Sequence, residues 1–135
     1  MRDVLFRGKR VDNGEIVEGF YIFDGFNHYI VKFYIDENAE GTLYPVQEAF
    51  EVIPETVGQF TGLTDKNGKK IFEGDIITIS SACVCMTGIV EFHDCGFEVH
   101  EYDTYEVLWY YPDELEVIGN IHDNPEMLEA TQDGT

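Results

Sequence analysis

The chain has 135 residues, of which 44% are hydrophobic and 14% aromatic, and its 27 acidic and 8 basic residues give a formal charge of −19. A chain of this length buries about two-thirds of its unfolded surface, which is enough for one domain or two small lobes. Tyr, Phe, Val and Ile dominate over Leu and Ala, and this composition favours strands over helices.

The charge is distributed unevenly along the sequence. Residues 1–70 hold all 8 basic residues, whereas residues 71–135 hold 15 acidic residues and no lysine or arginine. Because phosphate binding needs basic side chains that displace counterions, we expect no direct binding of nucleic acid and none of anionic membranes. An acidic half of this kind fits a basic partner or a role in solubility.

The sequence predicts a cytoplasmic protein. Residues 1–3 lead directly into a strand-like run without the pattern of a signal peptide, and no stretch reaches the roughly 18 apolar residues of a membrane-spanning helix. The cysteines form an odd set, Cys83, Cys85 and Cys95, which we expect to be reduced thiols.

The first part of the sequence is predicted to form strands joined by turns. Apolar runs on both sides of Asn13 and Gly14 indicate a hairpin, because an Asn-Gly pair favours a type I′ turn with positive φ at both residues. Residues 28–35 indicate another strand, and residues 36–42 a polar turn or loop. Residues 43–57 contain two prolines and are compatible with a short strand, a helical turn or both.

The second part repeats this organisation. Asn67 and Gly68 lie between two strand-like runs and predict another hairpin rather than a phosphate-binding loop, because strand-like residues follow where that loop needs Ser or Thr and a helix. Residues 87–103 alternate around a turn, residues 105–111 and 114–121 are strand-like, and Asn124 with Pro125 predicts a helix start.

These elements predict a mainly β fold. Roughly seven to ten short antiparallel strands, with turn signals about every 8–12 residues, indicate a small, partly open barrel or sandwich that ends in a short helix. We place an N-terminal β lobe at residues 1–55 and a C-terminal β lobe with the helix at residues 56–135, with one continuous domain as the alternative.

Long motifs in both halves resemble one known family. The stretches "QFTGLTDKNGKKIFEGDII" and "EVIGNIHDNPEML" are similar to the signature of the YopX family of phage and prophage proteins. The stretches "FRGKRVDNGEIVEG" and "VIPETVGQFTGL" resemble that family's longer form, whereas residues 80–113 match it poorly. The resemblance implies a mostly β protein encoded by a phage or prophage of a bacterial host, without established enzymatic activity. It also implies structural roles for Asn67-Gly68 and Gly119-Asn120, at turns and a strand end.

One group of residues could bind a metal ion. Cys83, Cys85, His93, Cys95 and His100 carry thiol and imidazole groups that suit zinc. The Cys-Val-Cys spacing is not that of a zinc knuckle. Cysteines that pack in a core as small apolar side chains account for the pattern. The sequence also lacks a Gly-x-Ser-x-Gly motif. We therefore predict no enzyme activity, catalytic residue, metal or cofactor.

An aromatic run predicts a protein interface. As a strand, residues 105–111 would place Trp109 and Tyr111 on one face and Tyr110 on the other. Tryptophan and tyrosine are enriched at binding hot spots, although core packing explains the run equally well. We predict an interface role for Trp109, Tyr110 and Tyr111.

Two functional hypotheses remain. The first is a non-catalytic phage or prophage accessory protein that forms a homo-oligomer and binds an unknown phage or host protein. The alternative is an acidic mimic of nucleic acid that inhibits a nucleic-acid-binding protein of the host. A contiguous ridge of carboxylates would support the mimic, and scattered carboxylates would not.

Overall fold

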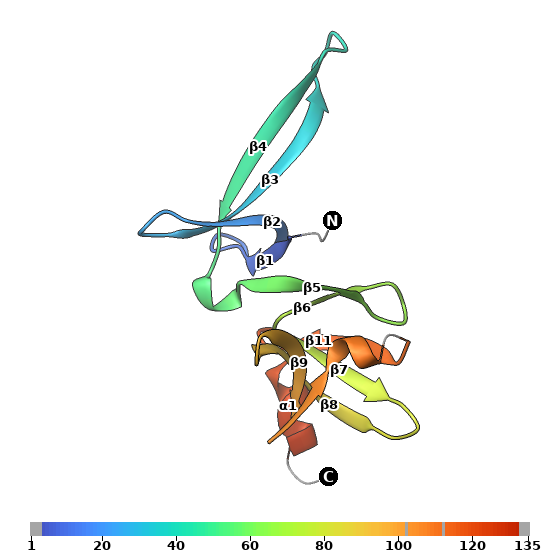
Figure 1. Ribbon diagram of the computed structural model, residues 1–135. Helices are drawn as coiled ribbons and strands as arrows, with labels where there is room; N and C mark the ends of the chain where they lie inside the picture. The colour runs from blue at the N-terminus through green and yellow to red at the C-terminus, as the bar shows by residue number, and fades with distance from the viewer. Residues whose placement is uncertain (1–3, 102, 112, 133–135) are drawn as a thin grey trace. The chain divides into compact units, whose positions relative to one another are not determined.

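The computed structural model describes residues 4–101, 103–111 and 113–132, and these form antiparallel strands with a short C-terminal helix (Figure 1). The mainly β prediction is confirmed, and the described strands do not close into a barrel. The elements in chain order are β1 (Phe6–Lys9), β2 (Ile16–Phe23), β3 (His28–Glu37), β4 (Leu43–Glu51), η1 (Pro54–Thr56), β5 (Gly58–Thr64), β6 (Lys70–Phe72), β7 (Asp75–Ser80), β8 (Cys85–His93), β9 (Gly96–Glu101), β10 (Thr104–Val107), η2 (Leu108–Tyr110), β11 (Leu115–Asn120) and α1 (Pro125–Gln132).

The chain divides after Gln59 into two compact units, called here the first and the second unit. In the first unit, β4, β3, β2 and β1 follow one another in an antiparallel sheet, and the start of β5 pairs with β1. A small core fills one face of this sheet, with Val17, Ile30 and Val52 buried at its centre. Strand β5 continues into the second unit, where it pairs with β6.

The Asn-Gly pairs lie in turns, but the turn type differs from the prediction. Among the described residues other than glycine, only Asp94 and Cys95 have positive φ, so Asn13 and Asn67 do not adopt type I′ geometry. Instead a single glycine supplies the left-handed residue in each turn, with φ of +82° at Gly68. The Asn-Gly signal therefore located the turns correctly but not their geometry.

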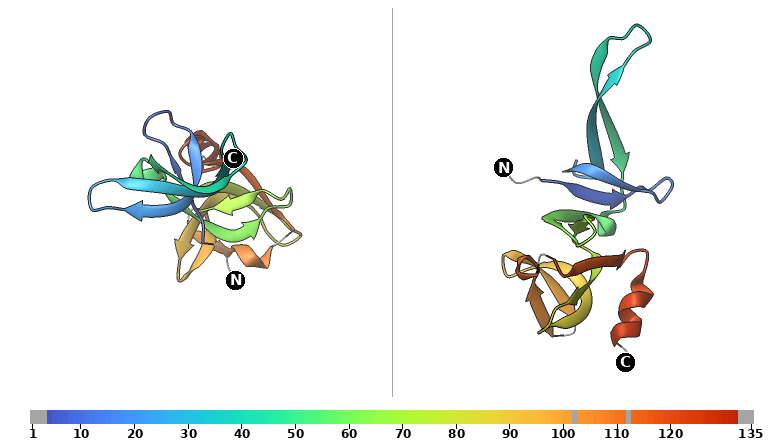
Figure 2. Two further views of the ribbon diagram at one scale, coloured as in Figure 1. Left: turned by 90° about the horizontal axis from the view of Figure 1, so that it is seen from above. Right: turned by 90° about the vertical axis from the view of Figure 1, so that its right-hand side faces the viewer.

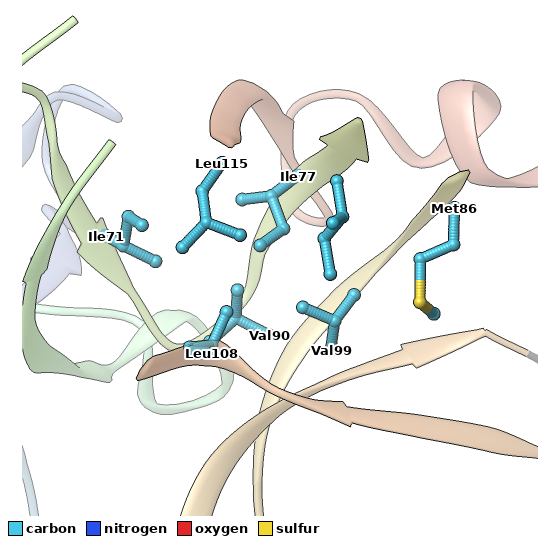
Figure 3. Close-up of a cluster of buried hydrophobic side chains, with 8 residues drawn as sticks. Ile71, Ile77, Met86, Val90, Val99, Leu108 and Leu115 are labelled. Carbon is cyan, nitrogen blue, oxygen red and sulfur yellow. The ribbon is translucent and has the colours of Figure 1, made fainter. Parts of the chain in front are cut away.

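The second unit is built on a five-stranded antiparallel sheet in the order β10, β9, β8, β7, β11. Its strands β7, β8, β9 and β11 contribute the buried Ile77, Ile79, Val90, Val99 and Leu115 to one core. Figure 3 shows that Ile71 from β6 and Leu108 from η2 join these side chains. The chain itself thus covers this apolar face.

Asp65 connects the β5–β6 turn to β11 in the second unit. Its carboxylate accepts hydrogen bonds from the backbone N–H groups of Asn67, Lys69 and Val117, each at 2.9 Å, and the residue is only 5% exposed. Burial raises the pKa of this carboxyl group, but the three N–H donors stabilise its charged form more strongly, so the pKa lies below its ordinary value.

The two-residue turn between β8 and β9 has the geometry expected of the Asn-Gly pairs. His93 pairs with Gly96, and the two residues between them, Asp94 and Cys95, have φ of 50° and 66°. Positive φ at both central positions fits the right-handed twist of a tight hairpin. Neither residue is glycine, so each bears a steric cost there.

Candidate interaction surface

The β3–β4 hairpin extends beyond the rest of the first unit. Strand β2 pairs with β3 only from His28 to Val31, whereas β3 and β4 remain paired from Tyr29 to Glu37. From Lys32 onward, β3 pairs with β4 alone among the described strands. The two strands therefore form a projecting ribbon (Figures 1 and 2). We call residues 32–48 the arm.

Local hydrogen bonds shape the arm. At its tip, the Asn38 side chain accepts hydrogen bonds from the backbone N–H groups of Glu40 and Thr42, and Gly41 has φ of +82°. Across the ribbon, the Tyr34 hydroxyl donates a hydrogen bond to Glu48, which raises the pKa of Tyr34 to about 12. A two-stranded hairpin is at best marginally stable alone in water, so these contacts do not replace a packed core.

Alternation along the strands gathers apolar side chains on one face of the sheet and arm. Residues directly opposite on antiparallel strands share a face, and so do residues two apart on one strand. Phe20 lies opposite Val31, and Ile35 lies opposite Pro45, which places β2, β3 and β4 residues together. We call this set the uncovered face; its members are Phe20, Ile22, Phe33, Ile35, Leu43 and Pro45.

The described part of the chain leaves the uncovered face open to solvent. Phe33 is 60% exposed and Ile35 is 64% exposed, and Phe20 packs edge to face against Phe33 with ring centroids 5.7 Å apart. The charged side chain on this face of the arm is Glu37, opposite Leu43 near the tip. Single exposed apolar residues are ordinary, but a contiguous set indicates a binding surface.

A groove lies along the arm. Phe33, Tyr34 and Ile35 from β3 line it together with Pro45, Val46 and Gln47 from β4, and its volume is about 410 Å³. None of the six carries a formal charge in a chain with a net charge of −19. This groove is open to solvent, and its apolar lining continues the exposed apolar surface of the arm.

A second exposed feature of the first unit is the turn between β2 and β3. Phe26 at this turn is 88% exposed. The Asp24 carboxylate accepts hydrogen bonds from the backbone N–H groups of Phe26 and Asn27, both at 2.8 Å, and these donors lower its pKa. Asp24 N–H also donates to the Asn27 carbonyl oxygen, so the turn is fixed by its own contacts.

The sequence-predicted interface residues lie in a different setting from the one expected. Strand β10 ends at Val107, and residues 108–110 form the 3₁₀ helix η2, so the strand predicted over residues 105–111 is confirmed for 105–107 and wrong beyond Val107. Leu108 is buried in the core of the second unit, Trp109 is 67% exposed, and the Tyr111 hydroxyl donates a hydrogen bond to Glu106. The Tyr110 side chain is outside the described part. The interface role of Trp109, Tyr110 and Tyr111 stays a prediction.

The thiol and imidazole side chains weighed above as zinc ligands do not converge. Cys85 begins β8 and His93 ends the same strand, about 26 Å apart at the rise of an extended strand. Cys83, Cys85 and Cys95 are exposed free thiols. Within residues 4–101, 103–111 and 113–132, no three His, Cys, Asp or Glu side chains form a metal-binding group.

Two carboxylates of the second unit have imidazole partners within the fold. Glu91 and Glu98 lie directly opposite each other on β8 and β9, where two like charges would repel. His100 lies 3.1 Å from Glu91 and His93 lies 3.2 Å from Glu98, and both imidazole rings stack on Tyr105. These carboxylates are therefore partnered rather than aligned in a free row.

The surface described above belongs to a mainly β protein with an exposed apolar arm, and comparisons with known proteins place it in a family. The family model described as "YopX protein" matches residues 5–129, so the chain belongs to the YopX family. It is similar to the crystal structure of protein EF1440 from Enterococcus faecalis, with 28% identity and a TM-score of 0.64 over 95% of this chain and 99% of that chain. A search of curated proteins found no match.

The described helices include none with the length and apolar character needed to cross a membrane.

Proposed function

We propose that this protein is a non-catalytic accessory protein of a phage or prophage that self-associates and binds another protein through its first unit. The observation that carries the proposal is the uncovered face, where Phe33 and Ile35 are more than half exposed on a ribbon without a core of its own. An apolar face of this kind gains free energy only when another surface covers it.

The energetic argument favours a contact between proteins. Full burial of one large apolar side chain is worth about 1.5–3 kcal/mol, and the uncovered face offers several such side chains in one patch. The six apolar members are uncharged and Glu37 lies near the tip of the arm, so two copies can approach along the rest of this face although each chain carries a charge of −19. The charge elsewhere opposes unspecific aggregation and leaves this face as the favoured contact.

The face of the arm, rather than its edge, is the proposed contact. The arm has two edges, because β4 lies at the end of the strand order and β3 pairs with β2 only as far as Val31. On β4, Pro45 removes one N–H donor and Glu48 adds charge, and on β3 Lys32 and Asp36 add charge. Proline and charge are the devices by which natural sheets prevent pairing along an edge.

The acidic mimic has less support. Glu91 and Glu98 face imidazole rings, and Asp65 and Asp75 are buried, so these carboxylates serve the fold. Salt separates the two hypotheses, since it screens the repulsion between two acidic chains but weakens binding to a basic partner. Self-association is expected to persist or strengthen as salt is raised.

Sedimentation velocity of the full chain over a range of concentrations tests the proposal with two matched variants. Phe33→Asp places a charge on the uncovered face, and Phe92→Asp changes the same residue type, 58% exposed, in the second unit. Both rings also contact another phenylalanine edge to face. We expect Phe33→Asp to weaken self-association at least about tenfold, as a loss of 1.4 kcal/mol or more would.

Phe92→Asp is expected to leave self-association unchanged. A wild-type chain that stays monomeric at every concentration contradicts self-association, and equal weakening by both variants contradicts the assignment to the uncovered face. Far-UV circular dichroism of both variants shows that each retains its strands.

A further inference from the structure

The two Asn-Gly turns place a reactive pair of groups at two exposed positions of the chain. Asn13 and Asn67 are both exposed, and the glycine after each has positive φ, +74° at Gly14 and +82° at Gly68. Open space surrounds the position that a Cβ would take at either glycine. Because glycine has no side chain, its backbone nitrogen is accessible to the carboxamide of the preceding asparagine.

These two groups can react with each other without an enzyme or a cofactor. The glycine nitrogen loses its proton and attacks Cγ of the asparagine, and the bond from Cγ to the side-chain nitrogen breaks with release of ammonia. The product is a five-membered succinimide ring. Water opens the ring at either of its carbonyl groups and leaves aspartate or isoaspartate, in which the main chain runs through the β-carbon. The net reaction consumes water, releases ammonia and needs no oxidant or reductant.

The attacking nitrogens are held alike in the two turns. Gly14 N–H donates a hydrogen bond to the Arg10 carbonyl oxygen at 3.0 Å, and Gly68 N–H donates one to the Asp65 carbonyl oxygen at 2.9 Å. Attack requires the loss of this bond in either turn. The nitrogens therefore give neither turn an advantage.

The carboxamides are held differently. Asn13 Oδ1 accepts a hydrogen bond from Glu15 N–H at 2.9 Å. Asn67 donates its backbone N–H to Asp65, and within the described part of the chain its exposed carboxamide has no hydrogen-bond partner. A change of side-chain orientation thus costs Asn13 a hydrogen bond and costs Asn67 none.

The charges that flank the two turns have opposite signs at the same positions. The two tetrapeptides are Asp12-Asn13-Gly14-Glu15 and Lys66-Asn67-Gly68-Lys69, and all their residues are exposed. The reaction passes through an anionic nitrogen and an anionic tetrahedral carbon. Positive neighbours stabilise both species and negative neighbours destabilise them, so the lysines favour reaction at the second turn.

Other charges near the turns do not reverse this contrast. They are Arg10, 2.6 Å from Asp12; Glu116, 3.6 Å from Lys66; and the buried Asp65 and exposed Lys70, which adjoin the second tetrapeptide. With these included, the first turn has two carboxylates against one guanidinium, and the second has three ammonium groups against two carboxylates. The first turn therefore stays negative and the second stays positive.

We propose that Asn67 is a site of spontaneous deamidation, and that the lysines on both sides of its turn make it react faster than Asn13. The site modifies itself, since the carboxamide and the attacking nitrogen belong to the same turn. This inference does not depend on the proposed function, because it concerns one turn and not the contacts of the uncovered face.

Modification at Asn67 is expected to loosen the β5–β6 turn. One oxygen of Asp65, Oδ1, accepts both the Asn67 and the Lys69 N–H at 2.9 Å. Isoaspartate adds a main-chain carbon between these two N–H groups, so they no longer fit the same oxygen. Aspartate keeps the original chain length and both bonds. The isoaspartate product should therefore be less stable than the variant Asn67→Asp.

Peptide mapping by mass spectrometry measures the reaction at both turns in one sample. The folded full chain is incubated at mildly alkaline pH in water enriched in a heavy oxygen isotope, which labels each new carboxyl group. We expect Asn67 to convert at least about threefold faster than Asn13. Asn67→Gln is the blocked control, because its longer side chain would have to form a less favourable six-membered ring.

Two matched variants test whether charge sets the order. Lys69→Glu and Glu15→Lys exchange the sign at the same offset from the asparagine, and both keep the backbone N–H groups that Asp65 and Asn13 bind. Lys69→Glu is expected to slow conversion at Asn67, and Glu15→Lys to speed it at Asn13, each about twofold or more. Circular dichroism and thermal unfolding before incubation show that both variants are folded.

The outcomes decide the inference in either direction. Faster conversion at Asn67, with rates that follow both charge exchanges, supports it. Equal rates, faster conversion at Asn13, no conversion at either turn, or rates that ignore the charge exchanges overturn it. The isoaspartate form, separated by chromatography, should unfold at a lower urea concentration than Asn67→Asp, and equal midpoints would overturn the loosening of the turn.

Discussion

The uncovered face of the first unit and the core of the second unit are both apolar faces of antiparallel sheets, but only the face in the second unit is buried. In the second unit, Ile77 and Ile79 are fully buried because β6 and η2 bring Ile71 and Leu108 onto the same face. In the first unit, Ile35 on the arm is 64% exposed, and no described segment lies over it. Similar strand chemistry thus stabilises the fold in one unit and remains available for contacts in the other.

The largest expected effect comes from the same substitution made on both faces. Ile77→Ala removes fully buried methyl groups and leaves a cavity, so we expect a loss of about 2–5 kcal/mol in the free energy of unfolding. Ile35→Ala removes side-chain atoms that already contact water. At low protein concentration, this variant is expected to change the free energy of unfolding by less than about 0.5 kcal/mol. Urea unfolding at low protein concentration measures both. A comparable loss in the two variants would contradict the contrast.

A second contrast lies in two turns held by aspartates. Asp65 is 5% exposed and accepts three backbone hydrogen bonds, whereas Asp24 is exposed and accepts two. We expect Asp65→Asn to cost about 1–3 kcal/mol, because a buried N–H group loses its partner. Asp24→Asn is expected to cost less than about 1 kcal/mol, because water replaces the lost acceptor. Equal costs, measured by urea unfolding, would count against the structural role of Asp65.

The lowered pKa of Asp65 predicts an acid-dependent loss of stability. Because its carboxylate is favoured in the folded state, the folded pKa lies below the unfolded one, and the stabilisation is complete above the unfolded value of about 3.9. It is then lost as the pH falls through the folded pKa. Unfolding free energies between pH 5 and pH 2 should fall more steeply for the wild type than for Asp65→Asn. Parallel curves would rule out this contribution.

The smallest expected effect concerns left-handed backbone positions. Cys95 has φ of 66°, which glycine adopts without steric cost, so Cys95→Gly is expected to stabilise the chain by up to about 1 kcal/mol. Gly68→Ala is the reverse control, because Gly68 has φ of +82° and open space around its α-carbon. It is expected to cost about 1 kcal/mol. Thermal unfolding measures both, and a destabilised Cys95→Gly variant would contradict the strain assigned to this turn.

Local patterns predicted much of the fold. The Asn-Gly pairs marked two turns, and Asn124 with Pro125 marked the start of α1, although the Asn124 side chain accepts a hydrogen bond from Asn120 N–H rather than from the helix. Because residues 43–57 contain two prolines, their sequence is compatible with a strand, a helical turn or both. The structure contains both, since β4 tolerates Pro45 and Pro54 begins η1.

The candidate site could not be predicted from the sequence. Apolar and polar residues alternate around Phe33 and Ile35 as they do in any half-buried strand, so the pattern does not tell whether another segment covers the apolar face. Whether the face is covered depends on contacts between distant parts of the sequence. The pairing of β2 with β3, for example, ends at Val31 of β3. Local propensity favours a strand throughout the aromatic run 105–111. The structure instead has a turn of 3₁₀ helix at residues 108–110, and Leu108 is buried in the core. Such tertiary packing cannot be read from the local pattern.

Hydrogen–deuterium exchange at two protein concentrations tests the central claim most directly. A two-stranded ribbon without a core exchanges rapidly, while the sheet of the second unit protects its own amides. If a second copy covers the uncovered face, amides of residues 32–48 become protected as the concentration rises, and those of Ile76 to Ser80 are protected throughout. Fast exchange of the arm at both concentrations, or protection that does not change between them, would contradict the account.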